Sequence, residues 1–500
     1  MKKSISLFIL IFVAFTYMRC TDLEENPKGL MAPEGFFKTP SDVEAAVNGA
    51  YAEFVHMSIE RLWTSLMLRS DMLDIGDLNT TPDYITINNF TMEANNSMTT
   101  FIWEQIFKGI SAANTAIKAA QEISADEEIK NELEAKARFI RGIFYYHLVR
   151  CFGPVPYLDS PVSSLEEIDA ISRTPENEIY EYIINDFIFA KANLPIANPG
   201  GARNIGTKGS AATALADVYL TLNQYDKALI EAKFVIVNAG NFNYGLEQNY
   251  QDLFNANLAG TLKEPIFTYD LKNTLNQGEY NPVHGLINFT RIRDYGPRSL
   301  SIVVPSLKVY QTWDDRDYRK KVCFEDSVIV NGKKVALTNT NFRVPRPHVA
   351  KYFRYPGPQE GGDDRSSDHR YPIYRYADVL LIAAEAIAES QGVTAEAINY
   401  INQIRERARF NGTTLTDFPA DVEAGISNED FIQVVREERR LEFAFEFKRW
   451  YDIKRWGTLE EAFTSSDSFE PHNVDKGRDY LFPIPQTEID VTNFNQNSGY

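Results

Sequence analysis

Histidine and cysteine are scarce in this chain, whose 500 residues include six histidines and three cysteines. The histidines form no HExxH motif and no other pair at metal-ligand spacing, and GxSxG, P-loop and GxGxxG motifs are missing. We therefore expect no catalytic residue, no metal and no cofactor. Acidic pairs such as Asp314-Asp315 leave a hydrolase as the alternative. The spacing of Cys151 and Cys323 suggests no bond, so we expect buried free thiols.

Positive charge is also in short supply, with 51 lysines and arginines against 69 acidic residues and a formal net charge of −18. A protein that binds nucleic acid needs a basic surface to neutralise phosphates. The composition therefore excludes that class of partner. An acidic chain is also repelled by anionic lipid, so any attachment to a membrane should come from an acyl anchor.

Long apolar runs are absent except at the N-terminus, where two lysines precede an apolar run over residues 5–18 and Cys20 follows. A charged start and a short apolar core are typical of a secretory signal, and the run is too short for a spanning helix. We predict a signal peptide at residues 1–19, a lipid anchor on Cys20 and a tether over residues 20–40.

Helical periodicity dominates both ends of the remaining chain. Amphipathic helices are predicted near residues 41–54, 101–114, 131–152 and 175–194. Residues 207–240 span one tetratricopeptide period of 34 residues, and residues 371–409 form a second pair with similar spacing. Such pairs must stack because none can bury its apolar face alone. The fold class we predict is mostly α, with tetratricopeptide-like helix pairs forming a helical body.

An irregular insertion interrupts this body. Residues 241–370 are rich in Gly, Pro, Asn, Tyr and Arg, and they include strand-like runs such as EPIFTYDL at 264–271. Asn331-Gly332 predicts a hairpin within SVIVNGKKVAL. We expect a single domain over residues 41–500, with a helical part up to about 240, this loop-rich mixed insertion, and C-terminal helices with a tail from 371. A further irregular loop is expected at residues 74–100.

The stretch from Ile426 to Gly457 is dense in charge and aromatic rings. Ser427 with Asp430 forms a capping box, and the apolar spacing behind it predicts one long helix. An ordinary solvated face would explain the charged stripe, and we favour that interpretation. The alternative is a half-buried lattice in which arginine forks bind carboxylates and aromatic rings surround them.

Four stretches resemble a known family. These are EERRLEFAFEFKRWYDIKRWG from Glu437, YLFPIPQTEIDVTNFNQNSGY from Tyr480, YPIYRYADVLLIAAEAIAES from Tyr371, and ARFIRGIFYYHLVRCFGPVPYL from Ala137. They resemble the SusD/RagB family of outer-membrane lipoproteins, which capture nutrients, mostly glycans, for a SusC-like TonB-dependent porin. The resemblance implies an outer-membrane, lipid-anchored and surface-exposed protein. It also implies a helical body that carries ligand on loops.

Two stretches outside the helices combine aromatic rings with polar side chains, the mixture that sugars require. They are Arg69–Asn89 and Asn288–Ser299. The residues that we predict to bind ligand are Asp71, Asp74, Tyr84, Arg291, Arg293, Asp294, Tyr295 and Arg298. Each has a plainer interpretation as a packing ring or a local ion pair. None of the five tryptophans falls clearly in these loops.

The function we predict is capture of an extracellular oligosaccharide for a partner porin, without chemistry on the ligand. A peptide nutrient is the alternative within the family, and the arginines near Tyr295 suit either an acidic sugar or a peptide carboxylate. A scaffold whose helix pairs bind only proteins is the alternative from a different class.

Overall fold

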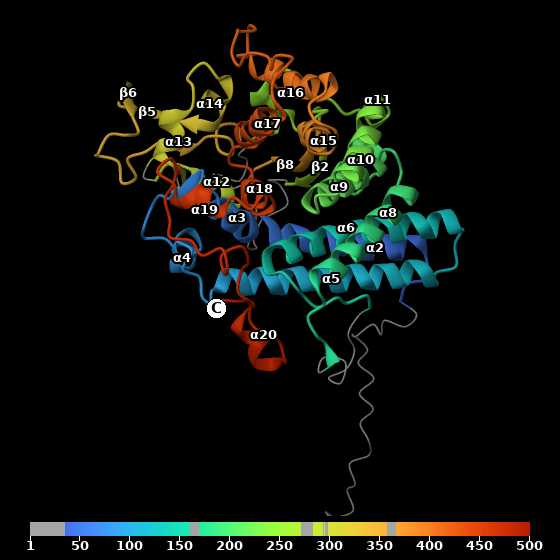
Figure 1. The fold of residues 1–500 in the computed structure, drawn as a ribbon. Helices are drawn as coiled ribbons and strands as arrows, with labels where there is room; N and C mark the ends of the chain where they lie inside the picture. Colours follow the sequence, from blue (N-terminus) through green and yellow to red (C-terminus); the bar gives the residue numbers. More distant parts are fainter. Residues whose placement is uncertain (1–35, 161–169, 272–283, 294, 296–298, 358–366) are drawn as a thin grey trace, which may run out of the picture. The chain divides into compact units, whose positions relative to one another are not determined.

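The computed structural model describes residues 36–160, 170–271, 284–293, 295, 299–357 and 367–500, without the side chains of residues 56–60, 284 and 285 (Figure 1). The predicted signal peptide and Cys20 lie outside the described residues. The chain divides into two units, residues 1–38 and residues 39–500. Every helix and strand below belongs to the second unit.

Helices make up most of the described chain (Figure 1). The long ones are α2 (Pro40–Met57), α5 (Ser97–Glu122), α6 (Glu127–Phe152), α8 (Glu176–Asn193), α9 (Lys208–Thr221), α10 (Tyr225–Val237), α15 (Tyr376–Gln391), α16 (Ala395–Ala408) and α17 (Asn428–Glu442). The short α-helices are α3 (Thr64–Leu68), α4 (Pro82–Asn88), α11 (Ala239–Phe242), α12 (His284–Thr290), α13 (Leu307–Thr312), α14 (Tyr318–Cys323), α18 (Arg449–Trp456), α19 (Leu459–Thr464) and α20 (Gln486–Val491). A π-helix, η1 (Ser58–Trp63), joins α2 to α3, and 3₁₀ turns cover η2 (Pro199–Gly201), η3 (Tyr250–Phe254) and η4 (Ala256–Leu258).

The predicted helix pairs are confirmed. Residues 207–240 fold as α9 and α10, and residues 371–409 contain α15 and α16, which pack beside them (Figure 1). Thr207 begins α9 with a capping box to Ser210. Each pair presents an apolar face to its neighbour, so the pairs form the helical body that the sequence predicts.

Close approach of α5, α6 and α8 depends on two glycines and one buried arginine. A methyl group on Gly109 of α5 would lie 2.2 Å from the ring of Phe144 in α6, and one on Gly142 would lie 2.6 Å from Phe187 in α8. Arg141 of α6 binds both carboxylate oxygens of Asp186 at 2.8 and 2.7 Å. The three helices therefore share one densely packed interface.

The described strands are all short, and all of them except β1 lie within residues 241–375. They form four two-stranded antiparallel sheets: β1 (Leu73–Ile75) with β3 (Val303–Pro305), β2 (Pro265–Asp270) with β8 (Arg370–Arg375), β4 (Phe324–Glu325) with β7 (His348–Val349), and β5 (Ser327–Val330) with β6 (Lys333–Ala336). The hairpin at Asn331-Gly332 is confirmed: both residues have positive φ, 49° and 75°, as a tight hairpin turn requires. The irregular loop predicted at residues 74–100 is wrong in part. The strand β1 ends inside this range, at Ile75, and the whole of α4 lies within it.

The stretch predicted as one long helix is two helices. α17 ends at Glu442, α18 begins at Arg449, and Phe445 between them has a left-handed φ of 62°. The hydroxyl of Tyr352 donates to the carbonyl of Phe445, and the Glu446 side chain turns inward to Arg375 at 3.1 Å. The single-helix prediction fails because these tertiary contacts hold the break, which no local glycine or proline signals. The Ser427 cap itself is confirmed.

The favoured solvated face is also wrong, because the charged stripe through Glu438, Glu442 and Glu446 is buried. We call the following residues the ion lattice: Glu264, Asp317, Arg319, Lys351, Arg375, Arg407, Glu438, Glu442 and Glu446, which are all less than a tenth exposed. Arg375 contacts Glu264 at 2.7 Å, and Arg319 contacts Glu438 at 2.6 Å. The lattice joins β8, α14, α16 and α17 (Figure 1).

The ion lattice is stable because each of its four glutamates contacts at least two cations, and Asp317 is held by Arg319. Burial opposes the ionisation of Glu442, but the guanidinium groups of Arg407, Arg375 and Arg319 outweigh burial and hold the pKa of that carboxyl well below its usual range. The aromatic rings follow the alternative that the sequence left open: Arg375 lies 4.4 Å from the ring centroid of Phe443. The charged stretch is therefore part of the core.

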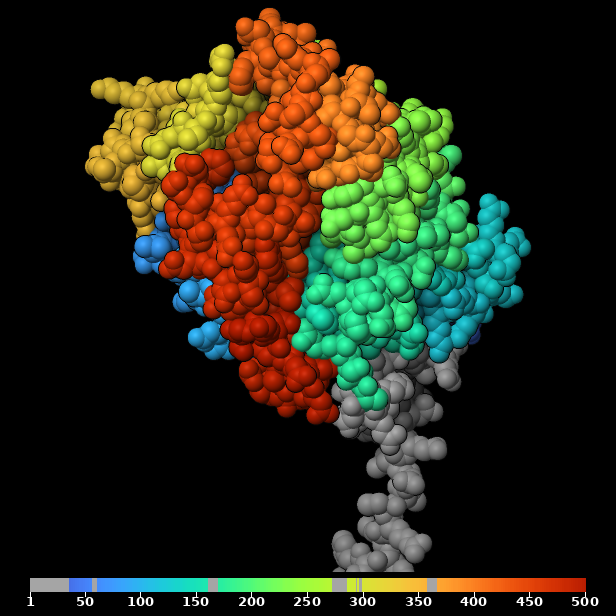
Figure 2. Space-filling view, in the orientation of Figure 1, coloured from blue at the N-terminus to red at the C-terminus, as the bar shows by residue number. Residues whose placement is uncertain are grey.

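The C-terminal residues form a strip on the face in Figure 2, between the insertion and the helix pairs. None of the described helices is both long and apolar enough to cross a membrane. Cys151 and Cys323 are buried and unbonded, as the sequence predicts.

Candidate functional site

The two stretches predicted to bind ligand lie side by side, because β1 pairs with β3. The register joins Leu73 to Pro305 and Ile75 to Val303. Beyond the strands, the backbone N–H of Asp77 donates to the carbonyl of Ser301 at 2.8 Å. We call this surface the loop face and define it by Asp74, Asp77, Leu78, Tyr84, Phe289, Arg293, Tyr295, Arg343 and Arg346.

Gly76 allows this close approach, since a Cβ there would lie 2.3 Å from the Ser301 carbonyl oxygen and 2.7 Å from Val304. We predict that Gly76→Ala destabilises the fold by about 1–3 kcal/mol through overpacking and weakens ligand binding by separating β1 from β3. Urea unfolding and ligand titration measure both effects. Gly49→Ala is the matched control: nothing lies within 4 Å of its added methyl group, so the helix should be unchanged or slightly more stable. Equal behaviour of the two variants would contradict the role of Gly76.

Ion pairs organise the floor of the loop face. The carboxylate of Asp77 is buried between Arg293 at 3.1 Å and Arg343 at 2.9 Å. Asp74 contacts Arg346 at 2.9 Å and accepts from the Asn88 amide at 3.0 Å. Among the described residues, these two guanidinium groups share one carboxylate, which leaves one positive charge at Asp77 without a second acidic partner.

The predicted ligand residues differ in how far their side chains are exposed to solvent. Tyr84 is 4% exposed and its ring packs edge-on against Phe289 at 5.7 Å. Tyr295 is 44% exposed, and its hydroxyl donates to the carbonyl of Ile329. Arg291 is partly buried just after α12. Asp294 and Arg298 lie outside the described residues.

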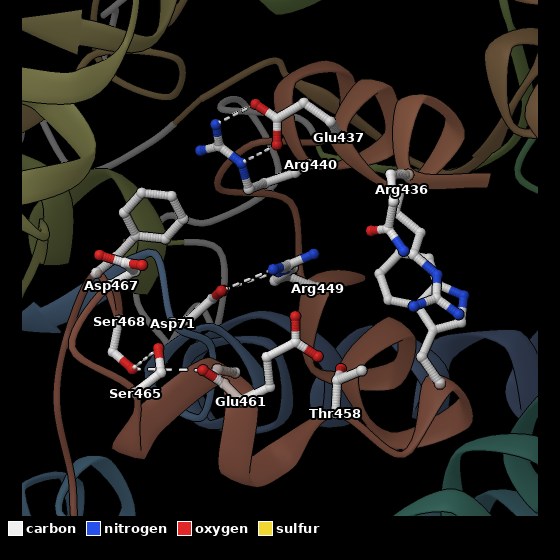
Figure 3. A pocket seen from close by; sticks show the side chains of 14 residues that line it. Asp71, Arg436, Glu437, Arg440, Arg449, Thr458, Glu461, Ser465, Asp467 and Ser468 are labelled. Atoms are coloured by element: carbon white, nitrogen blue, oxygen red, sulfur yellow. Dashed lines mark hydrogen bonds and ion pairs between the residues drawn. The ribbon is translucent and has the colours of Figure 1, made fainter. Parts of the chain in front are cut away.

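Asp71 lines a hollow that is separate from the loop face. The hollow has a volume of about 360 Å³ and lies between α17, α18, α19 and residues 465–469 (Figure 3). Arg449 binds both carboxylate oxygens of Asp71, at 2.8 and 2.7 Å. Arg440 binds Glu437 in the same two-handed way, and Arg436 lies 5.0 Å from the ring centroid of Trp456. The sequence analysis missed this hollow, because it assigned these arginines to folding.

The hollow in Figure 3 offers polar contacts from hydroxyl and carboxylate side chains. The hydroxyls of Ser465 and Ser468 lie 3.3 Å apart, and Ser468 also donates to the Glu461 carbonyl. Its lining within the described chain includes no histidine or cysteine. Nor do the described residues include a cluster of three or more side chains able to hold a metal ion.

Burial raises the pKa of one acidic side chain beside the loop face, that of Glu470. Desolvation, reinforced by the nearby charge of Asp74, raises the pKa of Glu470 to about 7. Ser306 and Arg346 oppose this rise. Glu470 therefore exchanges a proton near neutral pH, next to a surface whose other charges are fixed as ion pairs.

Fold and site together define a helical-repeat protein that carries a polar and aromatic face on inserted loops. Comparison with known sequences gives the family. The profile of the SusD family matches residues 305–500, and a related profile, described as starch-binding and associating with the outer membrane, matches residues 23–220. A SusD-like protein of Formosa agariphila, P2, is 43% identical over all of both chains. The chain belongs to the SusD family.

Solved structures show the same fold. A SusD homolog from Bacteroides thetaiotaomicron superposes with a TM-score of 0.80 at 23% identity, covering 94% of this chain and 98% of that one. A laminarin-binding SusD-like protein gives a TM-score of 0.78 at 22% identity, covering 93% of this chain and all of that one. The predicted family and the mostly α fold with a loop-rich insertion are thus confirmed.

Proposed function

We propose that this protein binds an extracellular oligosaccharide on its loop face and delivers it to a SusC-like TonB-dependent porin. The observation that carries the proposal is the meeting of the two polar and aromatic stretches at the β1–β3 pair. Tyr295 supplies an exposed ring for stacking on a sugar, and Arg293 and Arg343 supply donors for its hydroxyl groups. The laminarin-binding relative supports a carbohydrate as the ligand class.

The proposal extends to location and partners. A lipid on Cys20 would hold the protein at the outer membrane, consistent with the family profile described as associating with that membrane. The helix pairs α9–α10 and α15–α16 would face the porin. Ligand release into the porin requires weak binding, so we expect dissociation constants from micromolar to millimolar, about −8 to −4 kcal/mol.

Calorimetric titration of the chain from Thr21 against oligosaccharides and peptides tests this function. We predict that Tyr295→Ala weakens binding of the best oligosaccharide about tenfold, since the stacking ring is lost. Tyr295→Phe keeps the ring and should bind nearly normally. Tyr182→Ala removes another exposed tyrosine, in α8 away from the loop face, and should change nothing.

The outcomes separate the candidate functions. Heat with peptides alone would favour a peptide nutrient, and unchanged binding in Tyr295→Ala would exclude the loop face. Silence with every oligosaccharide and peptide would favour the scaffold.

A further inference from the structure

A second hollow lies in the insertion, and β5 and β6 contribute Ser327 and Lys334 to its lining. We call it the tyrosine cleft, and it has a volume of about 480 Å³. Three tyrosine rings from separate elements line it: Tyr310 of α13, Tyr318 at the start of α14, and Tyr355 after β7. Tyr355 is 40% exposed. Volume and aromatic content are those of a small-ligand site.

Each acid that lines the tyrosine cleft already has a donor within the protein. Lys320 contacts Asp315 at 2.6 Å, and Arg354 contacts Glu325 at 3.2 Å. Asp326 accepts from the Tyr310 hydroxyl at 3.1 Å and from Ser327 at 2.7 Å. Asp315 and Glu325 are therefore paired with cations, whereas Asp326 accepts only from neutral hydroxyls and keeps its charge.

Two cations at the cleft have no such partner. Lys321 and Lys334 line it with exposed side chains, and no carboxylate in the described part of the chain pairs with either. With four cations and three carboxylates in its lining, the cleft has one surplus positive charge on a chain with a net charge of −18. The described part of the loop face has a similar surplus, because Arg293 and Arg343 share Asp77. An acidic ligand would supply the missing negative charge at both places.

The β5–β6 hairpin contributes residues to both surfaces, since Ile329 contacts Tyr295 while Ser327 and Lys334 line the tyrosine cleft. The Tyr295 hydroxyl donates to the carbonyl of Ile329 in β5. Ile329 pairs across the hairpin with Lys334 of β6, so both side chains share one face, and Ile329 is 57% exposed. Neighbouring strands lie about 5 Å apart, so the hairpin is a narrow bridge. A chain of sugars that crosses it would meet Tyr295, then Ile329, then Lys334.

We propose that the loop face and the tyrosine cleft are two ends of one binding surface for an acidic oligosaccharide, whose carboxylate or sulfate groups are bound by Lys321 and Lys334. The sugar rings would stack on Tyr355 and Tyr295. This inference rests on the proposed function and adds the charge of the ligand and a second subsite to it.

Paired probes test the charge of the ligand. Oligouronides are compared with their carboxyl-reduced forms, and sulfated oligosaccharides with their desulfated forms, by calorimetry at low and high salt. We expect one acidic probe to bind at least tenfold more tightly than its neutral counterpart, with affinity that falls as salt rises. The two pairs distinguish a carboxylate from a sulfate ester.

Two double variants test the residues. Lys321→Gln with Lys334→Gln should weaken the acidic probe at least tenfold and leave its neutral counterpart unchanged. Lys118→Gln with Lys263→Gln makes the same change of charge at exposed sites outside both surfaces and should have no effect. Circular dichroism confirms that each variant is folded.

Three results would overturn the inference. The first is equal affinity for an acidic probe and its neutral counterpart, and the second is unchanged affinity for the acidic probe in the variant without Lys321 and Lys334. The third is that no acidic probe binds. Neutral oligosaccharides that still depend on Tyr295 would then preserve the proposed function. If the unmodified protein bound no oligosaccharide at all, both proposals would be overturned.

Discussion

Replacement of Arg375 by methionine should lower the free energy of unfolding by about 3–5 kcal/mol, because it removes a buried cation that three buried carboxylates share. Arg375 is fully buried, and it contacts Glu264 at 2.7 Å and Glu446 at 3.1 Å as well as Glu442. Methionine keeps much of the volume, so loss of charge and hydrogen bonds dominates. Urea unfolding followed by tryptophan fluorescence measures the change.

The matched control is Arg316→Met. Arg316 also binds a carboxylate, that of Asp314 at 2.7 Å, but its side chain is 67% exposed. Exposed pairs contribute little, so the unfolding midpoint should not move measurably. In the Arg375→Met background, Glu446 keeps only Lys351 as an ion-pair partner among the described residues. Glu446→Gln removes this less compensated charge and should recover part of the lost stability. If the Arg375 and Arg316 variants unfolded alike, the ion lattice would contribute no more than a surface pair.

The ion lattice also shows what the sequence could predict and what it could not. The arginines and carboxylates of α17 are visible as a stripe, but their partners are distant: Arg319 lies 119 positions before Glu438. Periodicity locates a helix face without saying what covers it. The break at Phe445 is hidden for the same reason, because Tyr352 and Arg375 hold it from other parts of the chain.

Elements that depend on local chemistry were predictable. The Ser427 cap, the Asn331-Gly332 hairpin and the α9–α10 pair each follow from residues a few positions apart. Helix pairs with a fixed period need only local spacing to be recognised, since each repeat is one structural unit. This is why the helical body was correct while the arrangement of its charges was not.

The candidate site was predictable as composition but not as geometry. Both ligand stretches were chosen for their mixture of rings and charges, and β1–β3 brings them together. Which side chains face solvent depends on distant partners: Phe289 covers Tyr84, and Arg449 binds Asp71. The tyrosine cleft was missed because its rings are spread over residues 310–355 and read singly as packing residues.

Acidification from pH 7 to pH 5 should destabilise the fold by several kcal/mol, because three histidines are buried in the neutral form. Burial lowers the pKa of His348 to about 4 and that of His369 to about 4, against the opposite effect of hydrogen bonds that the rings donate to backbone carbonyls. Burial and the charge of Arg150 hold the pKa of His147 well below its ordinary value. In the unfolded chain, the pKa of histidine is about 6.5.

The sign follows from proton binding. Between the folded and unfolded pKa values, the unfolded chain binds more protons, so stability rises with pH and is lost as pH falls below about 6.5. At pH 5 the cost is about 2 kcal/mol for each of His348 and His369. The depressed carboxylates Glu442 and Glu446 keep their contribution until pH falls below about 4.3, so they do not act in this window.

Glu470 acts in the opposite direction. Its raised pKa of about 7 makes the protonated form favourable in the folded state, so its contribution is full below the unfolded pKa and is lost as pH rises through 7. The side chain is partly solvated, which reduces its effect relative to that of the fully enclosed histidines. The net stability of the fold should therefore still rise with pH between pH 5 and pH 7.

Urea unfolding at pH 7 and pH 5 measures this slope, and substitution identifies its source. His348 contacts Ser301 at 2.7 Å, and His369 contacts the Tyr352 carbonyl at 3.0 Å, bonds that glutamine can replace in part. The variant with His348→Gln and His369→Gln starts less stable at pH 7 but should lose much less stability on acidification. An unchanged slope in that variant would show that other groups control the acid response, and a slope of opposite sign in the unmodified protein would show that Glu470 outweighs the buried histidines.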